Sequence, residues 1–341
     1  AASDVYKRQI KIRVLPFFVS RGFMRSLKYI VPAVLLAAVI GWQQLKAMIV
    51  AEGPLQEVVN VVIPKGAGTK LVAQELKKAG IIRHELLFRI ATRLNGADKA
   101  LKAGEYQFMP KVSVLQAMEK IARGEVFYRR ITIPEGLTSG QIMYMVANYP
   151  GLSGEITVDV KEGELLPETY SFELDAPRDN ILLQAKSAMA KIKQVIWDNR
   201  APGLPYKDIN EMMTMASIIE KETSVPEERA LVASVFINRL NRRMRLQTDP
   251  TVIYALTEGE FELKRPLRKS DLNTDSAFNT YRNYGLPPAP ICNPGVAAME
   301  AAAHPAQTDY LYFVASGNGG HNFARSLSEH NRNVRKWQRN R

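Results

Sequence analysis

The stretch "MASIIEKETSVPEERALVASVFINRL" (215–240) decides the fold of the C-terminal half of this chain. Apolar residues recur at helical spacing on both sides of a short polar segment, which predicts a helix over 208–222 and a second over about 225–242. The segment between them, "SVPE" (224–227), is typical of a capping box with proline early in the following helix. We therefore expect two helices to meet just beyond a pair of glutamates.

Those glutamates lie on different stripes of the first predicted helix. Glu220 shares a stripe with Ser217, whereas Glu222 shares one with Ile218. Burial of either carboxyl would raise its pKa, and a raised pKa is what lets a carboxylic acid keep its proton near neutral pH. The alternative is a solvated helix end in which both glutamates flank Lys221. The local pattern leaves both interpretations open.

Near the other end of the chain, "YIVPAVLLAAVIGW" (29–42) is almost wholly apolar, and no charge occurs between Lys28 and Lys46. The pattern predicts a transmembrane anchor over 29–45, preceded by a basic cytoplasmic segment over 1–28. The remainder would then be exported. A cleaved signal peptide and a buried soluble helix are the alternatives. No small-x-small cleavage site follows promptly, which favours an uncleaved anchor.

The charge and cysteine content of the chain limit the kinds of partner that it can have. The chain has 341 residues and a formal net charge of +12, with basic clusters at both termini that favour lipid headgroups or an acidic polymer. No zinc-finger spacing, aromatic RNA-binding signature or helix-turn-helix pattern is recognisable, so no nucleic-acid partner is expected. Cys292 is the only cysteine, which rules out an intrachain disulfide and leaves the compartment undefined.

A short motif recurs three times: "VVIPKGAGT" (61–69), "YQFMPKVS" (106–113) and "ITIPEGLT" (131–138). Each copy is a β-rich run, a Pro, a turn and then Thr69, Ser113 or Thr138, which are natural N-caps for the helix-like stretches that follow. We interpret 52–148 as a small α+β domain. It is either an ordinary fold with favourable turn chemistry or a glycan-binding module of the lysin-motif (LysM) kind.

The remaining chain divides into a connector with a first helix (149–207) and a denser domain (208–341). Near its end, 310–324 reads as a β-hairpin with a Gly-rich turn, followed by a basic terminal helix. The predicted fold class is thus α+β: an N-terminal transmembrane helix, a small LysM-like β-α domain and a mixed α+β catalytic domain.

The sequence lacks the motifs of several kinds of enzyme chemistry. The four histidines are scattered without metal-ligand spacing, so neither a metal nor any other cofactor is expected. No G-x-S-x-G elbow is present, and Cys292 sits in a turn-rich segment without a nearby histidine motif. Carboxylates remain as the candidate catalytic groups.

Four blocks read together resemble one family. They are the opening stretch, "MRLQTDPTVIYAL" (244–256), "FNTYRNYGLPPAPICNPG" (278–295) and "AAAHPAQTDYLYFVASGNGGHNF" (301–323). They closely resemble the endolytic murein transglycosylases, the YceG-like family. The resemblance covers the anchor, the repeated region and nearly all of 205–331, and the C-terminal blocks are the specific part.

The resemblance implies cleavage of the β-1,4 bond between N-acetylmuramic acid (MurNAc) and N-acetylglucosamine (GlcNAc) in peptidoglycan, leaving a 1,6-anhydroMurNAc end. It also implies that Glu220, the first glutamate of the E-K-E-T block, is the catalytic residue. An ordinary glycosidase needs two carboxylates. If the C6 hydroxyl of the sugar attacks instead, one carboxylate can serve as general acid and then as base.

Candidate substrate-binding residues lie in "LQTDPT" (246–251) and "FNTY" (278–281), whose polar groups suit sugar hydroxyls and whose tyrosine suits a ring face. They are Gln247, Thr248, Asp249, Asn279, Thr280 and Tyr281. An Asx-Pro turn that caps the next helix is the alternative interpretation of "TDPT". Asp249 as a second carboxylate is an open hypothesis.

Two other functions compete: a non-catalytic, membrane-tethered peptidoglycan-binding scaffold, and a hydrolase acting on the same bond. The intact E-K-E-T block favours the lyase. The resemblance further implies a single-pass protein of the inner membrane, with its C-terminal domains periplasmic or extracytoplasmic. There it would contact glycan strands and membrane lipid, lie near penicillin-binding synthases, and help to terminate or trim nascent strands.

Overall fold

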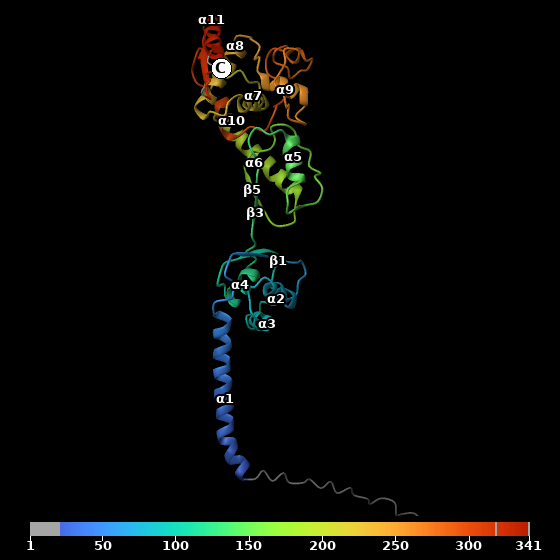
Figure 1. Cartoon of the computed structure of the whole chain (residues 1–341), viewed down its shortest axis with the longest axis vertical. Helices are drawn as coiled ribbons and strands as arrows, with labels where there is room; N and C mark the ends of the chain where they lie inside the picture. Colours follow the sequence, from blue (N-terminus) through green and yellow to red (C-terminus); the bar gives the residue numbers. More distant parts are fainter. Residues whose placement is uncertain (1–20, 318, 340–341) are drawn as a thin grey trace, which may run out of the picture. The chain divides into compact units, whose positions relative to one another are not determined.

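The computed structural model describes residues 21–317 and 319–339. The chain forms two compact units, which divide between Phe127 and Tyr128 (Figure 1). The predicted basic segment 1–28 lies mostly outside the described residues.

The first unit begins with a long apolar helix, α1 (Arg21–Val50). Its 23 residues from Lys28 to Val50 are long and apolar enough to cross a membrane, and 6% of the most apolar window is buried. The predicted span 29–45 therefore falls inside one continuous helix. The last turns of α1 differ from the rest, because Leu45 and Ile49 pack into the core of the first unit.

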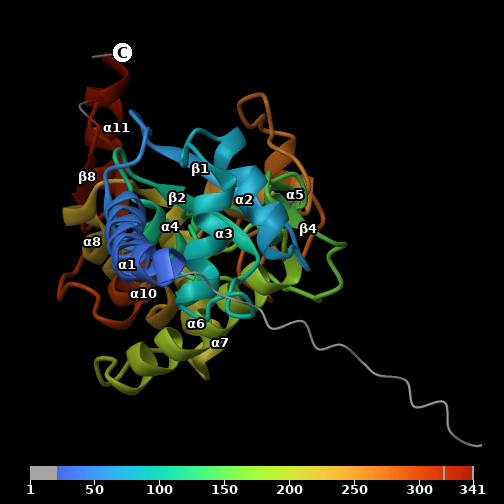
Figure 2. The same cartoon turned by 90° about the horizontal axis from the view of Figure 1, so that it is seen from below.

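The globular part of the first unit is a two-stranded sheet covered by helices. Strands β1 and β2 pair antiparallel, with Val59 opposite Phe108 and Ile63 opposite Gly104. Figure 2 shows α2, α3 and α4 gathered around this pair. Its core contains Leu76, Phe88, Tyr106 and Ile121. The elements are β1 (Val59–Ile63), α2 (Thr69–Lys78), α3 (Glu85–Leu94), β2 (Gly104–Phe108) and α4 (Val114–Arg123).

The predicted N-caps have different outcomes. Ser113 and Thr138 each form a complete capping box, the first on α4 and the second on α5 (Ser139–Ala147), so both predictions are confirmed. The prediction for Thr69 is wrong: Thr69 is the first residue of α2, and Gly68 occupies the cap without a side-chain bond. The Thr69 hydroxyl bonds instead to Asp98.

The third copy of the repeated motif lies in the second unit, whereas the predicted domain 52–148 grouped it with the first two. Its strand β3 (Arg129–Thr132) pairs antiparallel with β5 (Thr169–Phe172). Ile131 and Ile142 pack in one core with Phe172 and with α6 (Arg178–Asp198). The same strand-turn-helix motif therefore packs into two different hydrophobic cores. Two short strands, β4 (Leu152–Ser153) and β6 (Ala176–Pro177), complete this part.

The rest of the second unit is mainly helical, with a final hairpin and helix. Its elements are α7 (Ile209–Glu222), a 3-10 turn (Pro226–Glu228), α8 (Arg229–Asn241), α9 (Asp249–Thr257), a second 3-10 turn (Asp271–Asn273), α10 (Val296–Ala303), β7 (Tyr312–Ala315), β8 (His321–Ala324) and α11 (Leu327–Arg339). The predicted helix 208–222, the hairpin and the terminal helix are confirmed.

The join after α7 differs from the prediction. The Val225 N–H donates to the Thr223 hydroxyl at 3.1 Å, and Ser224 caps nothing. A 3-10 turn therefore precedes α8, which begins only at Arg229. The predicted capping box at 224–227 is wrong, because Thr223 rather than Ser224 supplies the accepting oxygen.

Helices α7 and α10 form the centre of this part of the chain (Figure 1). Met212 to Ile219 are buried along α7, and Ala298 and Ala302 of α10 are fully buried in the same core. Alanine side chains allow two helices to approach closely, because little volume separates their backbones. This approach brings the start of α10 next to the end of α7.

Candidate active site

Glu220 lies in the last turn of α7, and its side chain is half-buried. The N–H of Gly295, the N-cap residue of α10, donates to Glu220 Oε2 at 2.9 Å. One turn earlier, the Ser217 hydroxyl accepts the N–H of Ile291 at 3.0 Å. The segment 291–295 therefore runs along α7 and delivers a backbone amide to the carboxyl group.

The orientation of Glu220 follows from how α7 is fixed at both ends. Asp208 caps the helix by accepting the N–H groups of Asn210 and Glu211, at 2.8 and 3.0 Å. The apolar residues that follow are buried, which sets the rotation of the helix. Glu220 then projects from the face that packs against the start of α10.

The surroundings of Glu220 favour its protonated form. Its pKa is raised, first because burial removes water from the carboxylate. The Gly295 N–H opposes this shift, the charge of Glu135 adds to it, and Arg229 and Lys221 lower the pKa by smaller amounts. The net direction is upward, as a general acid requires.

Glu222 projects into different surroundings. It accepts a short hydrogen bond from the Thr248 hydroxyl. Burial, reinforced by the charge of Asp249, raises its pKa to about 7. Glu222 also lines a pocket of about 400 Å³. The other residues of this pocket are Arg239, Leu246, Gln247, Asp249, Tyr281, Tyr312, Phe313, Leu327 and His330.

Three of the predicted substrate-binding residues, Gln247, Asp249 and Tyr281, line this pocket together. The Tyr281 hydroxyl donates to Asp249 Oδ1 at 2.6 Å, and burial followed by this bond raises the tyrosine pKa. Gln247 has a φ of +48°, a left-handed conformation that is uncommon for residues other than glycine. Its N–H donates to the Thr280 carbonyl at 3.3 Å, which helps to hold this conformation.

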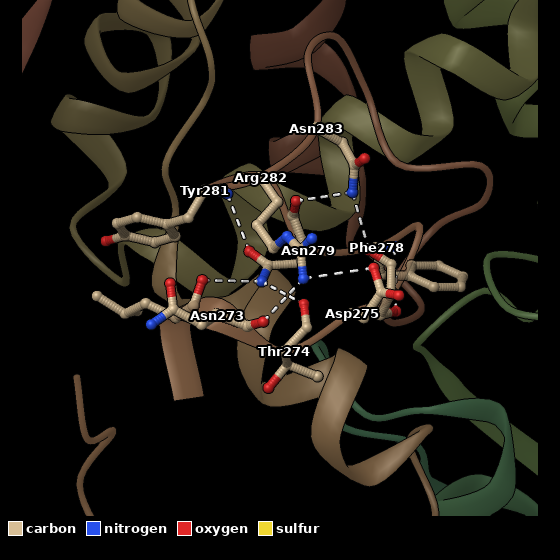
Figure 3. Close-up of polar contacts among 10 residues, drawn as sticks. Asn273, Thr274, Asp275, Phe278, Asn279, Tyr281, Arg282 and Asn283 are labelled. Carbon is tan, nitrogen blue, oxygen red and sulfur yellow. Dashed lines mark hydrogen bonds and ion pairs between the residues drawn. The ribbon is translucent and has the colours of Figure 1, made fainter. Parts of the chain in front are cut away.

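Thr248, Asn279 and Thr280 are buried behind the pocket wall. The Asn279 side chain donates to the carbonyls of Leu272 and Thr274 and accepts the Tyr281 N–H, so it closes the loop drawn in Figure 3. The Thr280 hydroxyl accepts the Thr248 N–H at 3.1 Å. Their polar groups are therefore engaged with the protein, and none of these three residues lines the pocket.

Sequence reasoning did not single out Glu135, Gly295 or Arg239. Arg239 lies in the pocket wall, where its guanidinium donates to the carbonyls of Leu311 and Leu246 at 2.6 and 2.7 Å. The motif copy at 131–138 contains Glu135, but its sequence pattern predicts only a strand, a turn and an N-cap. Nothing in the local sequence connects Gly295 to a glutamate 75 residues away.

Other reactive groups have different roles. The Cys292 thiol is buried, donates to the Ser217 carbonyl at 3.4 Å and has a pKa raised by burial, so it is no activated nucleophile. Within 21–317 and 319–339, no group of three or more His, Cys, Asp or Glu side chains could hold a metal ion.

Comparison with known proteins places the chain in a family. The model of the YceG-like family matches residues 61–336. An endolytic murein transglycosylase of Bacillus subtilis (strain 168) is 34% identical over 315 residues, covering 82% of this chain and 84% of that protein. One of Streptococcus pneumoniae (strain R6) is 30% identical over 323 residues, covering 81% of this chain and 58% of that protein. The chain belongs to the YceG-like family.

A YceG-like protein from Listeria monocytogenes has a crystal structure at 2.6 Å. It is 32% identical to this chain, and the superposition covers 81% of this chain and 99% of that one with a TM-score of 0.49. The family assignment rests on the sequence relationships alone.

Proposed function

We propose that this protein is a lytic transglycosylase that cleaves the MurNAc-β-1,4-GlcNAc bond of peptidoglycan and leaves a 1,6-anhydroMurNAc end. Membership of the YceG-like family supports this activity, because the curated relatives are named endolytic murein transglycosylases. The observation that carries the proposal is the half-buried carboxyl of Glu220, with its raised pKa and the Gly295 N–H at 2.9 Å.

Glu220 acts twice in the proposed reaction. It first donates its proton to the glycosidic oxygen as the bond from that oxygen to C1 of MurNAc breaks. The C6 hydroxyl of the same sugar then bonds to C1, and Glu220 accepts its proton. The carboxyl is thereby restored, no water is consumed, and no second carboxylate is needed to activate one. The high effective concentration of an intramolecular hydroxyl favours this route.

The pocket beside Glu222 supplies contacts to the glycan. Gln247 and Asp249 have polar groups suited to sugar hydroxyls, and Tyr281 has a ring suited to a sugar face. Thr248, Asn279 and Thr280 support this surface from behind, through the bonds that hold the two loops. The six predicted residues thus divide into three that touch substrate and three that position the others.

In this proposal, the first unit attaches the enzyme to the membrane and to the glycan. Helix α1 is the proposed single-pass anchor of the inner membrane, with the N-terminus cytoplasmic and the rest of the chain extracytoplasmic. The length and apolar character of the 23-residue stretch Lys28–Val50 support this role. The β1-α2-α3-β2 arrangement supports a LysM-like glycan-binding unit. Anchored in this way, the enzyme would cut nascent strands close to the membrane and near penicillin-binding synthases.

The test is digestion of purified peptidoglycan by the full chain in detergent, with the released sugars weighed by mass spectrometry. We expect products one water lighter than hydrolytic fragments, and none of them from Glu220→Gln. Full-mass reducing ends would show a hydrolase and direct attention to Asp249 or Glu135. If the unsubstituted protein binds peptidoglycan but releases no sugar fragments from it, the protein is a scaffold.

A further inference from the structure

Two carboxyl groups flank Gly295. Glu220 Oε2 accepts its N–H at 2.9 Å. On another side of the same residue, a Cβ built on Gly295 would lie 1.8 Å from Oε1 and 2.2 Å from Cδ of Glu135. The Glu135 carboxyl therefore fills the space that any side chain at 295 would need. Glycine at this position allows both acids to approach one point of the backbone.

The loop that carries Glu135 is fastened on both sides. The Gly136 N–H donates to the Asn293 carbonyl at 3.0 Å, and the Asn293 N–H donates to the Leu137 carbonyl at 2.9 Å. The Asn293 side chain is fully buried and bonds to Leu165 and Ser139. Glu135 is thus attached to the segment that also contains Gly295, rather than to a free surface loop.

Helix α7 contacts the same loop directly. The Lys221 ammonium donates to the Gly136 carbonyl at 3.2 Å. A Cβ on Gly136 would lie 3.6 Å from Cγ of Glu220. The Glu135 backbone is therefore held beside the catalytic glutamate by two independent connections, one to 293 and one to Lys221.

The charged and titratable groups around Glu220 come from four segments. Glu135 comes from the loop after β3, Lys221 from α7 itself, Arg229 from the start of α8, and the Cys292 thiol from the segment before α10. Of the three charged groups, only Glu135 has the same sign as an ionised Glu220. Arg229 and Lys221 oppose protonation of Glu220, and Lys221 is also engaged with the Gly136 carbonyl.

We propose that Glu135 is a positioning residue for Glu220, whose fixed negative charge beside Gly295 keeps the catalytic carboxyl in the protonated form that glycan cleavage requires. This inference rests on the proposed function. Glu135 need not touch the glycan, because it acts through the charge that Glu220 experiences. It adds to the effect of burial and offsets the two neighbouring cations, which lower the pKa of Glu220.

The test is the pH profile of glycan cleavage by the full chain and by Glu135→Gln, with anhydro products counted by mass spectrometry between about pH 5 and pH 8. Without the charge of Glu135, Glu220 loses its proton at lower pH, so the basic limb should move toward lower pH. We expect rates within about twofold of the unsubstituted protein near pH 5 and at least about fivefold lower near pH 8. Glu135→Asp should restore part of the basic limb.

Glu155→Gln is the matched control, because it removes one negative charge from an exposed glutamate of the same unit. Its profile should not move. A Glu135→Gln profile lowered by one factor at every pH would overturn the inference, since that result indicates structural damage. An unmoved basic limb in Glu135→Gln would overturn it equally, and if Glu135→Gln does not fold, Glu135→Ala replaces it under the same criterion. An unsubstituted protein that forms no anhydro products would refute the proposed function instead.

Discussion

Glu220 and Glu222 are separated by one residue on α7, yet they face different parts of the protein. Glu220 meets a backbone amide and three charged side chains, which come from the loop after β3, the start of α8 and α7 itself. Glu222 meets a threonine hydroxyl and a pocket shared with Asp249. Both pKa values are raised, and desolvation is the main cause for each. A perturbed pKa therefore identifies the region of a site, but not which carboxyl reacts.

What distinguishes the two glutamates is the partner that each would have when ionised. Glu220 has a fixed amide donor that remains after proton loss, and opposite charges close by. The pKa of Glu222 is also lowered by nearby His321 and Arg239 and raised by Asp249, but its hydrogen-bond donor is the rotatable hydroxyl of Thr248 rather than a fixed amide. We therefore expect Glu220 to exchange protons during turnover and Glu222 to support the pocket.

The largest expected effect comes from Glu220→Gln. An amide cannot donate the proton, so formation of anhydro products should fall by about 10²–10⁴-fold, as measured by mass spectrometry on purified peptidoglycan. Retained binding to peptidoglycan would show that the variant is folded. A variant with more than about a tenth of the original rate, paired with an inactive Glu222→Gln, would reverse the assignment of the two residues.

Gly295→Ala should have the next largest effect. Its Cβ would lie 1.8 Å from the Glu135 carboxyl, so either Glu135 or the Gly295 amide must move away from Glu220. We expect an activity loss of about 10–100-fold, because displacement of a catalytic group by about 1 Å is costly.

Gly68→Ala is the control for Gly295→Ala, since a Cβ there would meet nothing within 4 Å and the backbone φ is −76°. Equal rates for Gly295→Ala and the unsubstituted protein would mean that the Gly295 contact is dispensable.

Tyr281→Phe tests the pocket side of the comparison. It removes the hydroxyl that donates to Asp249 at 2.6 Å and keeps the ring. We expect KM for soluble glycan strands to rise about 3–10-fold with little change in kcat, which corresponds to the loss of one hydrogen bond. Tyr144→Phe, at an exposed tyrosine of α5 in the same unit, should change neither parameter. A fall in kcat alone would place Tyr281 in the chemical step instead.

Glu222→Gln should have the smallest effect on activity, with rates within about threefold of the unsubstituted protein near pH 6. Its effect on stability depends on pH. The folded-state pKa of Glu222 is raised from 4.5 to about 7, so the folded protein binds a proton that the unfolded chain releases in this window. That contribution is complete below about pH 4.5 and is lost as the pH rises through about 7.

Glutamine cannot lose a proton, so the free energy of unfolding of Glu222→Gln relative to the unsubstituted protein should increase from pH 4.5 to pH 8. After allowance for solvent screening, we expect an increase of about 1–2 kcal/mol, measured by urea unfolding at both pH values. A constant difference would show that the folded protein does not perturb Glu222.

Helical periodicity predicted α7 to within one residue at its start and correctly at its end, because its buried face is continuous. The hairpin of β7 and β8 was also predicted from its turn composition. The helix α3 was not predicted. Its buried Phe88 and Ala91 complete the core of the first unit, but the run is short and lies between stronger turn signals.

The candidate site was only partly predictable. Local sequence narrowed the choice to two glutamates, and the family resemblance selected Glu220. The segment "FNTY" suggested exposed sugar contacts, whereas Asn279 is 0% exposed and Thr280 is 2% exposed, because their polar groups hold the surrounding loops. Glu135 and Gly295 reach Glu220 only through tertiary packing, which no local pattern encodes.

The position of Gly295 at the N-terminus of α10 has a consequence for the two halves of the reaction. The free amides at the start of a helix carry partial positive charge, and the first of them already contacts Glu220. When the carboxyl gives up its proton, the dipole that stabilises the new anion is in place, so little reorganisation energy is required. The same glutamate can then take the second proton without any rearrangement of its surroundings.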